Sequence, residues 1–181
     1  ARVPNRRIPL LATLPNAQSM RTKPAAGWPV VIFQHGITLN RTIMFAMADS
    51  FASQGFAVIA IDLPLHGITD TRSPFYQAPN ERHFNMDNVG AVGVVAPDGQ
   101  IANGWQILNV ANPLNARDHI RQAVADTIAL KRTLPGLDFN GDAAPDLDPN
   151  RIHYVGISLG SIISGVFLGL DTDMKTVTLS S

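Results

Sequence analysis

Two short runs of apolar residues, separated by a segment of helical periodicity, constrain the fold of this chain more than any other feature. Residues 29–34 and 56–61 carry no charge and are rich in β-branched and aromatic side chains, as strands buried on both faces are. Between them, residues 41–54 place apolar side chains at helical spacing, with Asn40 to cap the start and Gly55 to end the helix. Two strands joined through a helix form a βαβ unit, which predicts a parallel sheet with a right-handed crossover.

The rest of the chain continues this alternation. A helix is expected from Asn115, as its capping residue, to about Leu134, with Asp118 as a capping-box partner. Pro135 and Gly136 end it. Three further elements follow, namely a strand at 151–156, a helix at 158–170 and a strand at 175–180. The pattern predicts an α/β fold of three layers, in which helices cover both faces of a mainly parallel central sheet.

A long irregular segment interrupts the pattern between about residues 69 and 113. Proline and glycine recur through it without periodicity, and it is far longer than an ordinary connection. We therefore expect an insertion or a lid in this part of the chain. Its large apolar side chains either contact an acyl chain or lipid, or simply pack, and the sequence leaves both interpretations open. They are Phe75, Tyr76, Phe84, Met86 and Trp105.

The composition of the 181-residue chain excludes several classes of function. Its 14 Lys and Arg balance 14 Asp and Glu without a basic stripe, so binding to nucleic acid has no electrostatic basis. The absence of cysteine excludes a disulfide framework, a thiolate zinc site and a cysteine nucleophile. With 45% hydrophobic residues the chain can bury one sizeable core, and residues 1–181 are expected to belong to one domain.

The stretch from Ile152 to Leu170 is uncharged and is therefore considered as a membrane span. Its first part is rich in residues that favour strands, His153 interrupts it, and two glycines flank a serine within it. These features indicate a buried strand that turns into a buried helix, and the membrane interpretation is rejected.

The sequence Gly156-Ile157-Ser158-Leu159-Gly160 stands at the junction between that strand and that helix. A serine hydroxyl is a weak nucleophile, and a Gly-x-Ser-x-Gly elbow presents it on a strained turn where only small neighbours fit. The five-residue pattern is common by chance, but a strand-to-helix junction is the context that the elbow requires. We therefore predict that Ser158 is the nucleophile and that Gly156 and Gly160 provide the clearance. The N–H groups at the start of the helix then face the developing negative charge.

A second chemical element follows the first central strand, at residues 35–38. Gly36 allows the next backbone group to approach a tetrahedral oxyanion, which makes the N–H of Ile37 a candidate donor. The N–H of Leu159, directly after the nucleophile, is the other candidate. His35 is interpreted as a strand-end histidine bonded to nearby backbone rather than as a catalytic group.

Three motifs, in this order, resemble the α/β-hydrolase superfamily: Gln34-His35-Gly36, Asp62-Leu63-Pro64-Leu65-His66-Gly67 and the serine elbow. Residues 121–126 and the Asp-rich loop that follows resemble, more narrowly, extracellular bacterial lipases of the virulence-factor lipase group. The resemblance implies hydrolysis of a small-molecule or lipid carboxylic ester through an acyl-serine intermediate, with acyl chains held beneath a mobile cap. It also implies a secreted or cell-surface bacterial protein that contacts a lipid interface, and a structural role for His66.

The base and the acid of a serine hydrolase are not found after Ser158, where this fold places them. All five histidines precede Ser158, and the only later carboxylates are Asp171 and Asp173. We therefore expect the N-terminal part of a longer hydrolase, incomplete at the C-terminal end of its sheet and inactive without the remaining C-terminal part. Two alternatives stay open: a non-catalytic binding or scaffold domain, and a peptidase, thioesterase or acyltransferase that uses the same elbow.

The acidic loop around residues 138–148 is the candidate for a metal site. Its oxygen-bearing side chains alternate as they do in calcium-binding loops. A full calcium loop has glycine at its sixth position and glutamate at its twelfth, where this chain has Ala143 and Pro149. The alternative is a solvated acidic turn, and no other cofactor is expected. The candidate calcium ligands are Asp138, Asn140, Asp142 and Asp146.

Overall fold

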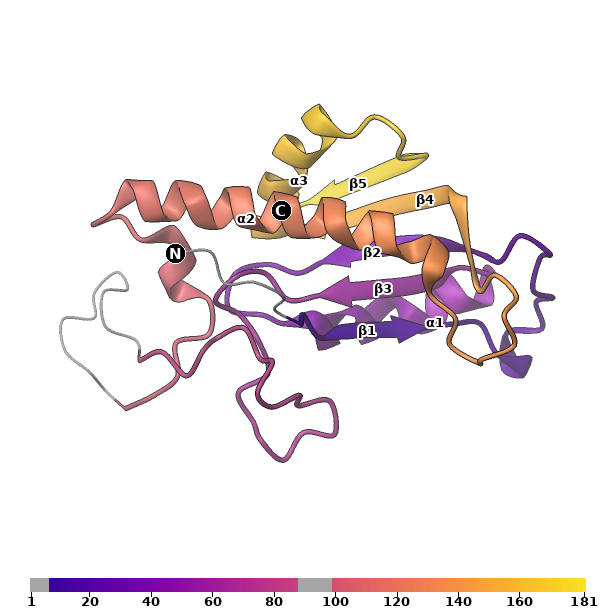
Figure 1. Ribbon diagram of the computed structural model, residues 1–181, viewed down its shortest axis with the longest axis horizontal. Helices are drawn as coiled ribbons and strands as arrows, with labels where there is room; N and C mark the ends of the chain where they lie inside the picture. The colour runs from indigo at the N-terminus through magenta and orange to yellow at the C-terminus, as the bar shows by residue number, and fades with distance from the viewer. Residues whose placement is uncertain (1–6, 88–98) are drawn as a thin grey trace.

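The computed structural model describes residues 7–87 and 99–181, which form an α/β fold around one five-stranded sheet (Figure 1). The strands are β1 (Leu10–Thr13), β2 (Trp28–Gln34), β3 (Ala57–Ile61), β4 (Leu147–Ile157) and β5 (Thr176–Ser180). The α-helices are α1 (Phe45–Ser53), α2 (Pro113–Thr133) and α3 (Leu159–Leu170). The short 3-10 helices of the described residues are η1 (Ala17–Ser19), η2 (Arg41–Met44), η3 (Trp105–Leu108) and η4 (Leu134–Gly136). The predicted fold class is confirmed.

The strand order β1-β3-β2-β4-β5 places β2 at the centre of the sheet. Strands β2 to β5 run parallel. In their register, Ile32 of β2 pairs with Ile59 of β3 on one side and with Tyr154 of β4 on the other. The antiparallel edge strand β1 was not predicted, because four half-buried residues carry too little periodicity to identify a strand. The parallel strands bring their carboxyl ends to one edge of the sheet, where the loops that follow them meet.

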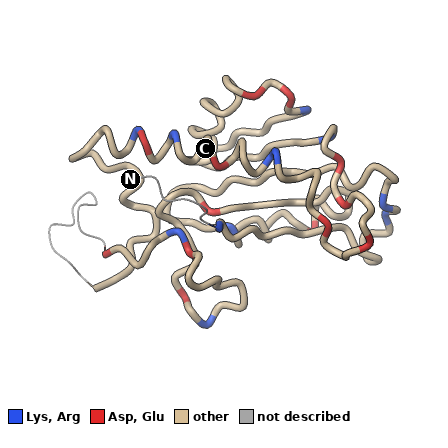
Figure 2. The backbone as a smooth tube through the Cα atoms, in the orientation of Figure 1, with Lys and Arg blue, Asp and Glu red and all other residues tan. Residues whose placement is uncertain are grey.

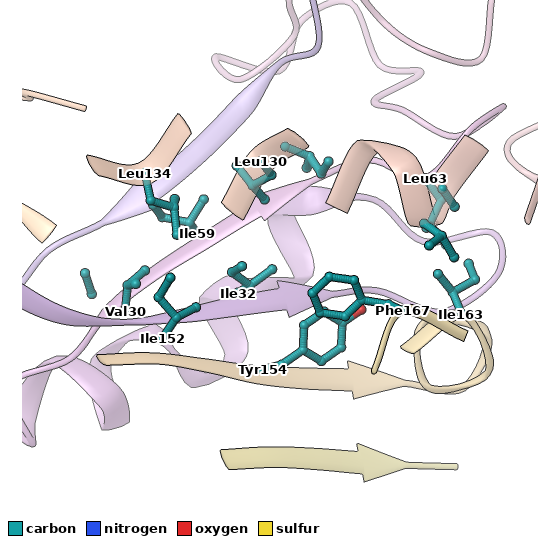
Figure 3. Packing of buried hydrophobic residues seen from close by; sticks show 14 of the residues in the cluster. Val30, Ile32, Ile59, Leu63, Leu130, Leu134, Ile152, Tyr154, Ile163 and Phe167 are labelled. Atoms are coloured by element: carbon teal, nitrogen blue, oxygen red, sulfur yellow. The ribbon is translucent and has the colours of Figure 1, made fainter. Parts of the chain in front are cut away.

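Alternate side chains of the central strands face opposite sides, and helices cover both. Val31 of β2 and Met44 of η2 belong to a core cluster on the side of α1. Ile32 faces the other way, into a larger core with Leu130 of α2 and Phe167 of α3. Figure 3 shows α2 and α3 over this larger core, with the side chains of β2, β3 and β4 pointing toward them. The three predicted layers are therefore present.

Two helices begin differently from the prediction. The helix after β2 starts as the 3-10 turn η2. The predicted cap, Asn40, is present, and its side chain accepts the N–H of Thr42. Helix α2 starts at Pro113 and is capped by Asn112, not by Asn115, whose own N–H the Asn112 side chain accepts at 3.3 Å. Proline suits the first helical position because its missing N–H would have no partner there. The predicted capping-box partner Asp118 instead binds Arg117 at 2.8 Å.

The long segment between β3 and α2 is anchored to the body of the protein at two places. Residues 69–80 are mostly exposed, but residues 81–83 are buried, and so are most residues from 102 to 107. Residues 88–98, which include three of its punctuating glycines and prolines, lie outside the described residues. The predicted insertion is therefore held against the carboxyl edge of the sheet near both ends, and a lid remains a prediction.

Basic and acidic residues are mixed along most of the described chain. The exception is the loop at residues 138–148, which carries Asp and neither Lys nor Arg (Figure 2). Within the described residues, no helix is both long and apolar enough to cross a bilayer.

Candidate active site

Ser158 stands at the end of β4, where the chain turns into α3. Its backbone has φ 51° and ψ −116°, a conformation that a residue with a β-carbon adopts only when its surroundings enforce it. The residue is exposed at the carboxyl edge of the sheet. The local geometry is that of the strained elbow expected from the sequence.

Gly156 and Gly160 flank this turn at positions where no side chain fits. A β-carbon at residue 160 would lie 2.4 Å from the carbonyl oxygen of Gln34, at the end of the neighbouring strand β2. At residue 156 it would lie 2.8 Å from the hydroxyl oxygen of Ser164 and 2.9 Å from the backbone of Gly160. These separations are shorter than van der Waals contact, so α3 approaches β2 and β4 this closely only because both residues are glycine.

The N–H of Leu159 belongs to the first turn of α3 and has no acceptor within the helix. The side chain of Leu159 is buried, which leaves the backbone as its polar contribution. The preceding N–H, that of Ser158, is donated to the carbonyl of Ser180 in β5 at 2.7 Å. The positive end of the dipole of α3 lies at this point and favours negative charge there. The N–H of Leu159 is therefore suited to donate to an oxyanion.

The loop after β2 lies directly beside Ser158, the candidate nucleophile. A β-carbon at residue 36 would come within 3.1 Å of the β-carbon of Ser158. Within residues 7–87 and 99–181, no acceptor takes the N–H of Ile37, the residue after Gly36. The tertiary structure thus brings Gly36, Ile37, Ser158 and Leu159 together at the carboxyl edge of the sheet.

His35 is fully buried, and both of its ring nitrogens bond backbone groups. Nε2 accepts the N–H of Leu63 at 3.1 Å, which places the ring proton on Nδ1, and Nδ1 donates to the carbonyl of Gly36 at 2.7 Å. Burial lowers the pKa of His35 to about 4, so the ring is neutral at pH 7. These are the bonds expected of a structural histidine.

The same ring orients the candidate oxyanion donor. The carbonyl of Gly36 and the N–H of Ile37 belong to one planar trans peptide group, so they point in opposite directions. Because His35 binds the carbonyl, the N–H of Ile37 points away from His35.

His66 is buried beside His35, with the ring centroids 5.0 Å apart. Its Nδ1 donates to the carbonyl of Pro64 at 2.8 Å, and its Nε2 accepts the N–H of Thr38 at 3.2 Å. Burial, reinforced by the neighbouring His35, lowers the pKa of His66 to about 4. A neutral ring bonded on both nitrogens is a structural group, as the resemblance implied.

Comparison of the sequence with family models matches the first part of the sheet. The family described as platelet-activating factor acetylhydrolase, isoform II, matches residues 10–71, from β1 to beyond the turn after β3. A search of curated proteins finds no match.

Solved structures match nearly the whole chain. An acetyl xylan esterase from Paenibacillus sp. R4 matches 87% of it, with 21% identity and a TM-score of 0.52. A lipase in an open form matches 95% with 20% identity and a TM-score of 0.52, and a ferulic acid esterase from Streptomyces cinnamoneus matches 82% with 19% identity and a TM-score of 0.51. The chain has the α/β-hydrolase fold. It spans 40%, 39% and 34% of these three proteins, respectively.

The α/β-hydrolase fold predicted from the three motifs is confirmed, over two fifths or less of the length of these structural relatives. The three motifs lie at the end of β2, after β3 and between β4 and α3. The narrower resemblance to the virulence-factor lipase group stays a prediction.

Within this α/β-hydrolase fold, the described residues bring no base to Ser158. No side chain of residues 7–87 or 99–181 hydrogen bonds to its hydroxyl. His83 and His153 bond Ile68 and Thr176 instead, and Asp171 binds Lys131 at 2.5 Å. The described part of the fold therefore contains the candidate nucleophile and the candidate oxyanion donors, without a candidate base bonded to Ser158.

A buried ionic network supports the loops around the site, and sequence reasoning missed it. The guanidinium of Arg41 binds the carboxylates of Asp62 and Glu81, and Glu81 Oε1 lies 2.7 Å from Nη2. Burial raises the pKa of Asp62 although Arg41 opposes this. At Glu81, burial is outweighed by hydrogen bonds from Arg41 and from two backbone N–H groups, which lower the pKa. Asp62 and Glu81 lie 21 and 40 positions after Arg41. No sequence motif spans such separations, so nothing in the sequence indicated the network.

The acidic loop lies at the amino end of β4, away from the serine elbow (Figure 1). The carboxylate of Asp138 accepts hydrogen bonds from the N–H groups of Gly141 and Ala143. The carboxylate of Asp146 accepts one from Nζ of Lys23 at 2.6 Å and one from the N–H of Phe139 at 2.7 Å. Among the described residues, no group of three or more carboxylate or histidine side chains is arranged to hold a metal ion. The loop is held by its own backbone, by the Asn140 side chain and by Lys23, and calcium binding stays a prediction.

Proposed function

We propose that this chain carries the nucleophile half of a serine carboxylic-ester hydrolase that acts through an acyl-serine intermediate. The observation that carries the proposal is the close approach of Gly36 to Ser158, which is held at φ 51°. Gly36 precedes the N–H of Ile37, for which the described residues provide no acceptor. A nucleophile and an oxyanion donor have to reach the same carbonyl group of the substrate. Gly36 and Ser158 lie close together although they are 122 positions apart in the sequence.

In the proposed reaction, the Ser158 hydroxyl attacks the ester carbonyl carbon while a base takes its proton. The carbonyl oxygen becomes an oxyanion and accepts the N–H groups of Ile37 and Leu159. The tetrahedral intermediate then expels the alcohol, which receives the proton from the base. Water, deprotonated by the same base, releases the acid from the acyl-serine and restores the hydroxyl.

We assign the base and the acid to polypeptide outside residues 1–181, the proposed remaining C-terminal part of the hydrolase. His35 and His66 are unsuitable as bases because each ring uses both nitrogens for structural bonds. The described residues lack any other histidine that bonds to Ser158.

The substrate is proposed to be a small-molecule or lipid ester. Four large apolar side chains of the irregular segment, Phe75, Phe84, Met86 and Trp105, are exposed and support contact with an acyl chain or a lipid interface, while Tyr76 is half-buried. The structural relatives are named for acetyl xylan, ferulic acid and lipid esters, which have a carboxylic ester in common. Secretion or attachment to the bacterial cell surface is part of the same proposal.

The test is active-site titration of the full natural polypeptide with a short p-nitrophenyl ester. We expect a burst of p-nitrophenol equivalent to the enzyme concentration, followed by turnover. Ser158→Ala should abolish the burst and the turnover, whereas Ser50→Ala, on the exposed face of α1, should change neither. A protein that folds and shows no burst would instead be a binding or scaffold domain. A burst with faster turnover of amides or thioesters, or transfer to an alcohol, would indicate a peptidase, thioesterase or acyltransferase.

A further inference from the structure

Asn103 lies in the long segment between β3 and α2, and its half-buried side chain joins two loops of the site. Its Nδ2 donates to the carbonyl of Thr38 at 2.7 Å, and its Oδ1 accepts the N–H of Gly67 at 3.0 Å. We propose that Asn103 is a positioning residue that holds the oxyanion loop, residues 36–39, in the conformation that presents the N–H of Ile37. This assignment rests on the proposed function.

The oxyanion loop needs such support because its backbone is strained. Thr38 has φ 64°, which is unfavourable for a β-branched residue and persists only where surrounding contacts enforce it. The Thr38 hydroxyl donates to the carbonyl of Ile37 at 2.6 Å, and the Thr38 N–H is bound by His66. The third polar group of Thr38 is its carbonyl, which accepts the hydrogen bond from Asn103.

The bond from Asn103 reaches the candidate donor through two planar peptide groups. The carbonyl of Thr38 shares a peptide group with the N–H of Leu39, and that N–H approaches the carbonyl of Gly36 at 3.4 Å. The carbonyl of Gly36 in turn shares a peptide group with the N–H of Ile37. Asn103 and His35 therefore act on the same group from two sides, since His35 also binds the Gly36 carbonyl.

The position of Asn103 is itself fixed by its neighbours. The N–H of Ala102 donates to the carbonyl of Met86 at 2.8 Å, and the N–H of Gly104 donates to the carbonyl of Leu65 at 2.9 Å. Gly104 packs against the His66 ring. The irregular segment thus has a positioning role as well as any role as a cap, and Asn103 is where it contacts the oxyanion loop.

The deciding experiment compares Asn103→Asp with Asn85→Asp in the full natural polypeptide. Asn103→Asp keeps an acceptor for Gly67 but replaces the donor to Thr38 by a carboxylate oxygen. Asn85→Asp adds the same charge to the same segment at an exposed position with φ 52°, which Asp tolerates as Asn does. The kcat and KM for a p-nitrophenyl ester are measured per titrated Ser158, so that unfolded protein does not count. The rate of Ser158 phosphonylation by a p-nitrophenyl phosphonate is measured alongside.

We expect Asn103→Asp to lower kcat and the phosphonylation rate by about tenfold, less than the loss on removing an oxyanion donor outright. KM should be unchanged, and Asn85→Asp should match the wild type in all three. Amide hydrogen exchange at Thr38 and Leu39 should accelerate in Asn103→Asp. Asn103→Ala adds no charge and is the second variant if Asn103→Asp folds poorly. It should show the same pattern.

Three results would overturn the assignment. Wild-type kcat in both Asn103 variants, with faster exchange at Thr38, would show that the bond is structural only. Unchanged exchange would show that Asn103 does not hold the loop. A wild-type protein that neither hydrolyses the ester nor reacts with the phosphonate would disprove the proposed function and the catalytic part of this assignment with it, while the exchange data would still report on the loop.

Discussion

Gly104 lies directly against the imidazole of His66: a β-carbon at residue 104 would come 1.9 Å from Nε2, the atom that accepts the N–H of Thr38. We expect Gly104→Ala to displace the ring and to lower the free energy of unfolding by about 3 kcal/mol through overpacking and strain. The ester kcat should fall with it. Gly99→Ala is the matched control, because residue 99 also has positive φ, 73° against 81°, but no atom of residues 7–87 or 100–181 lies within 4 Å of the added carbon. Urea denaturation and ester kinetics check both, and equal losses in the two variants would contradict the role of the His66 contact.

Helix α3 carries its own matched pair of glycines. Gly160→Ala would place a β-carbon 2.4 Å from the Gln34 carbonyl, so we expect a loss of about 3 kcal/mol in the free energy of unfolding. Gly165 has free space around it, and alanine there should gain about 1 kcal/mol through helix propensity. Chemical denaturation measures both. A tolerated Gly160→Ala would show that α3 does not pack on β2 as described.

The strain at Ser158 predicts an unusual stability order at the nucleophile. With φ 51° and ψ −116°, residue 158 suits glycine, so Ser158→Gly should be more stable than Ser158→Ala by about 1–2 kcal/mol. Both variants lack the hydroxyl and should be inactive, which separates stability from catalysis. Thermal unfolding measures the difference, and an alanine variant at least as stable as the glycine variant would show that the elbow is unstrained.

The two buried histidines predict a loss of stability in mild acid. Burial lowers the pKa of His35 and of His66 from 6.5 to about 4, so between these values the unfolded chain binds protons that the folded chain does not. The contribution is complete above pH 6.5 and falls as the pH drops toward 4, by up to about 3 kcal/mol for each ring. His153, whose pKa is also lowered by burial, acts in the same direction.

Urea unfolding from about pH 7.5 to about pH 5 tests this, because the histidines of the unfolded chain take up their protons in this range while His35 and His66 in the folded chain stay neutral. His66→Gln keeps an acceptor for Thr38 and removes one titrating ring, so it should flatten the pH dependence. A slope identical to that of the wild type would disagree with the burial of this ring.

The buried network around Arg41 predicts a large difference between two arginines. Arg41→Met leaves the carboxylates of Asp62 and Glu81 buried without their cation, which should cost about 3–5 kcal/mol of unfolding free energy. Arg72→Met removes an exposed arginine paired with Asp70 and should leave stability unchanged. Denaturation curves compare the two, and a neutral Arg41→Met would mean that the network is not structural.

Much of the fold and half of the site could be predicted from local sequence. The central strands, the helices and the elbow at Ser158 depend on apolar periodicity, on caps and on the need for glycine in a tight turn, which all act over a few residues. Where a local signal was short or ambiguous the prediction failed, as with the half-buried edge strand β1 and with the cap of α2, which is Asn112, directly before the first helical residue Pro113.

The sequence by itself determined that a serine would stand on a strained turn between a strand and a helix, because sterics at residues 156–160 allow little else. It did not determine how deeply the helix is buried, since α3 exposes Ile162, Val166 and Leu170. Only the tertiary structure decided what surrounds that turn. Asn103 and Gly104 lie in an irregular segment without a motif, yet they support the loop that faces Ser158. Hydrogen bonds between distant segments depend on how the sheet brings loop ends together, and neither propensity nor periodicity carries that information.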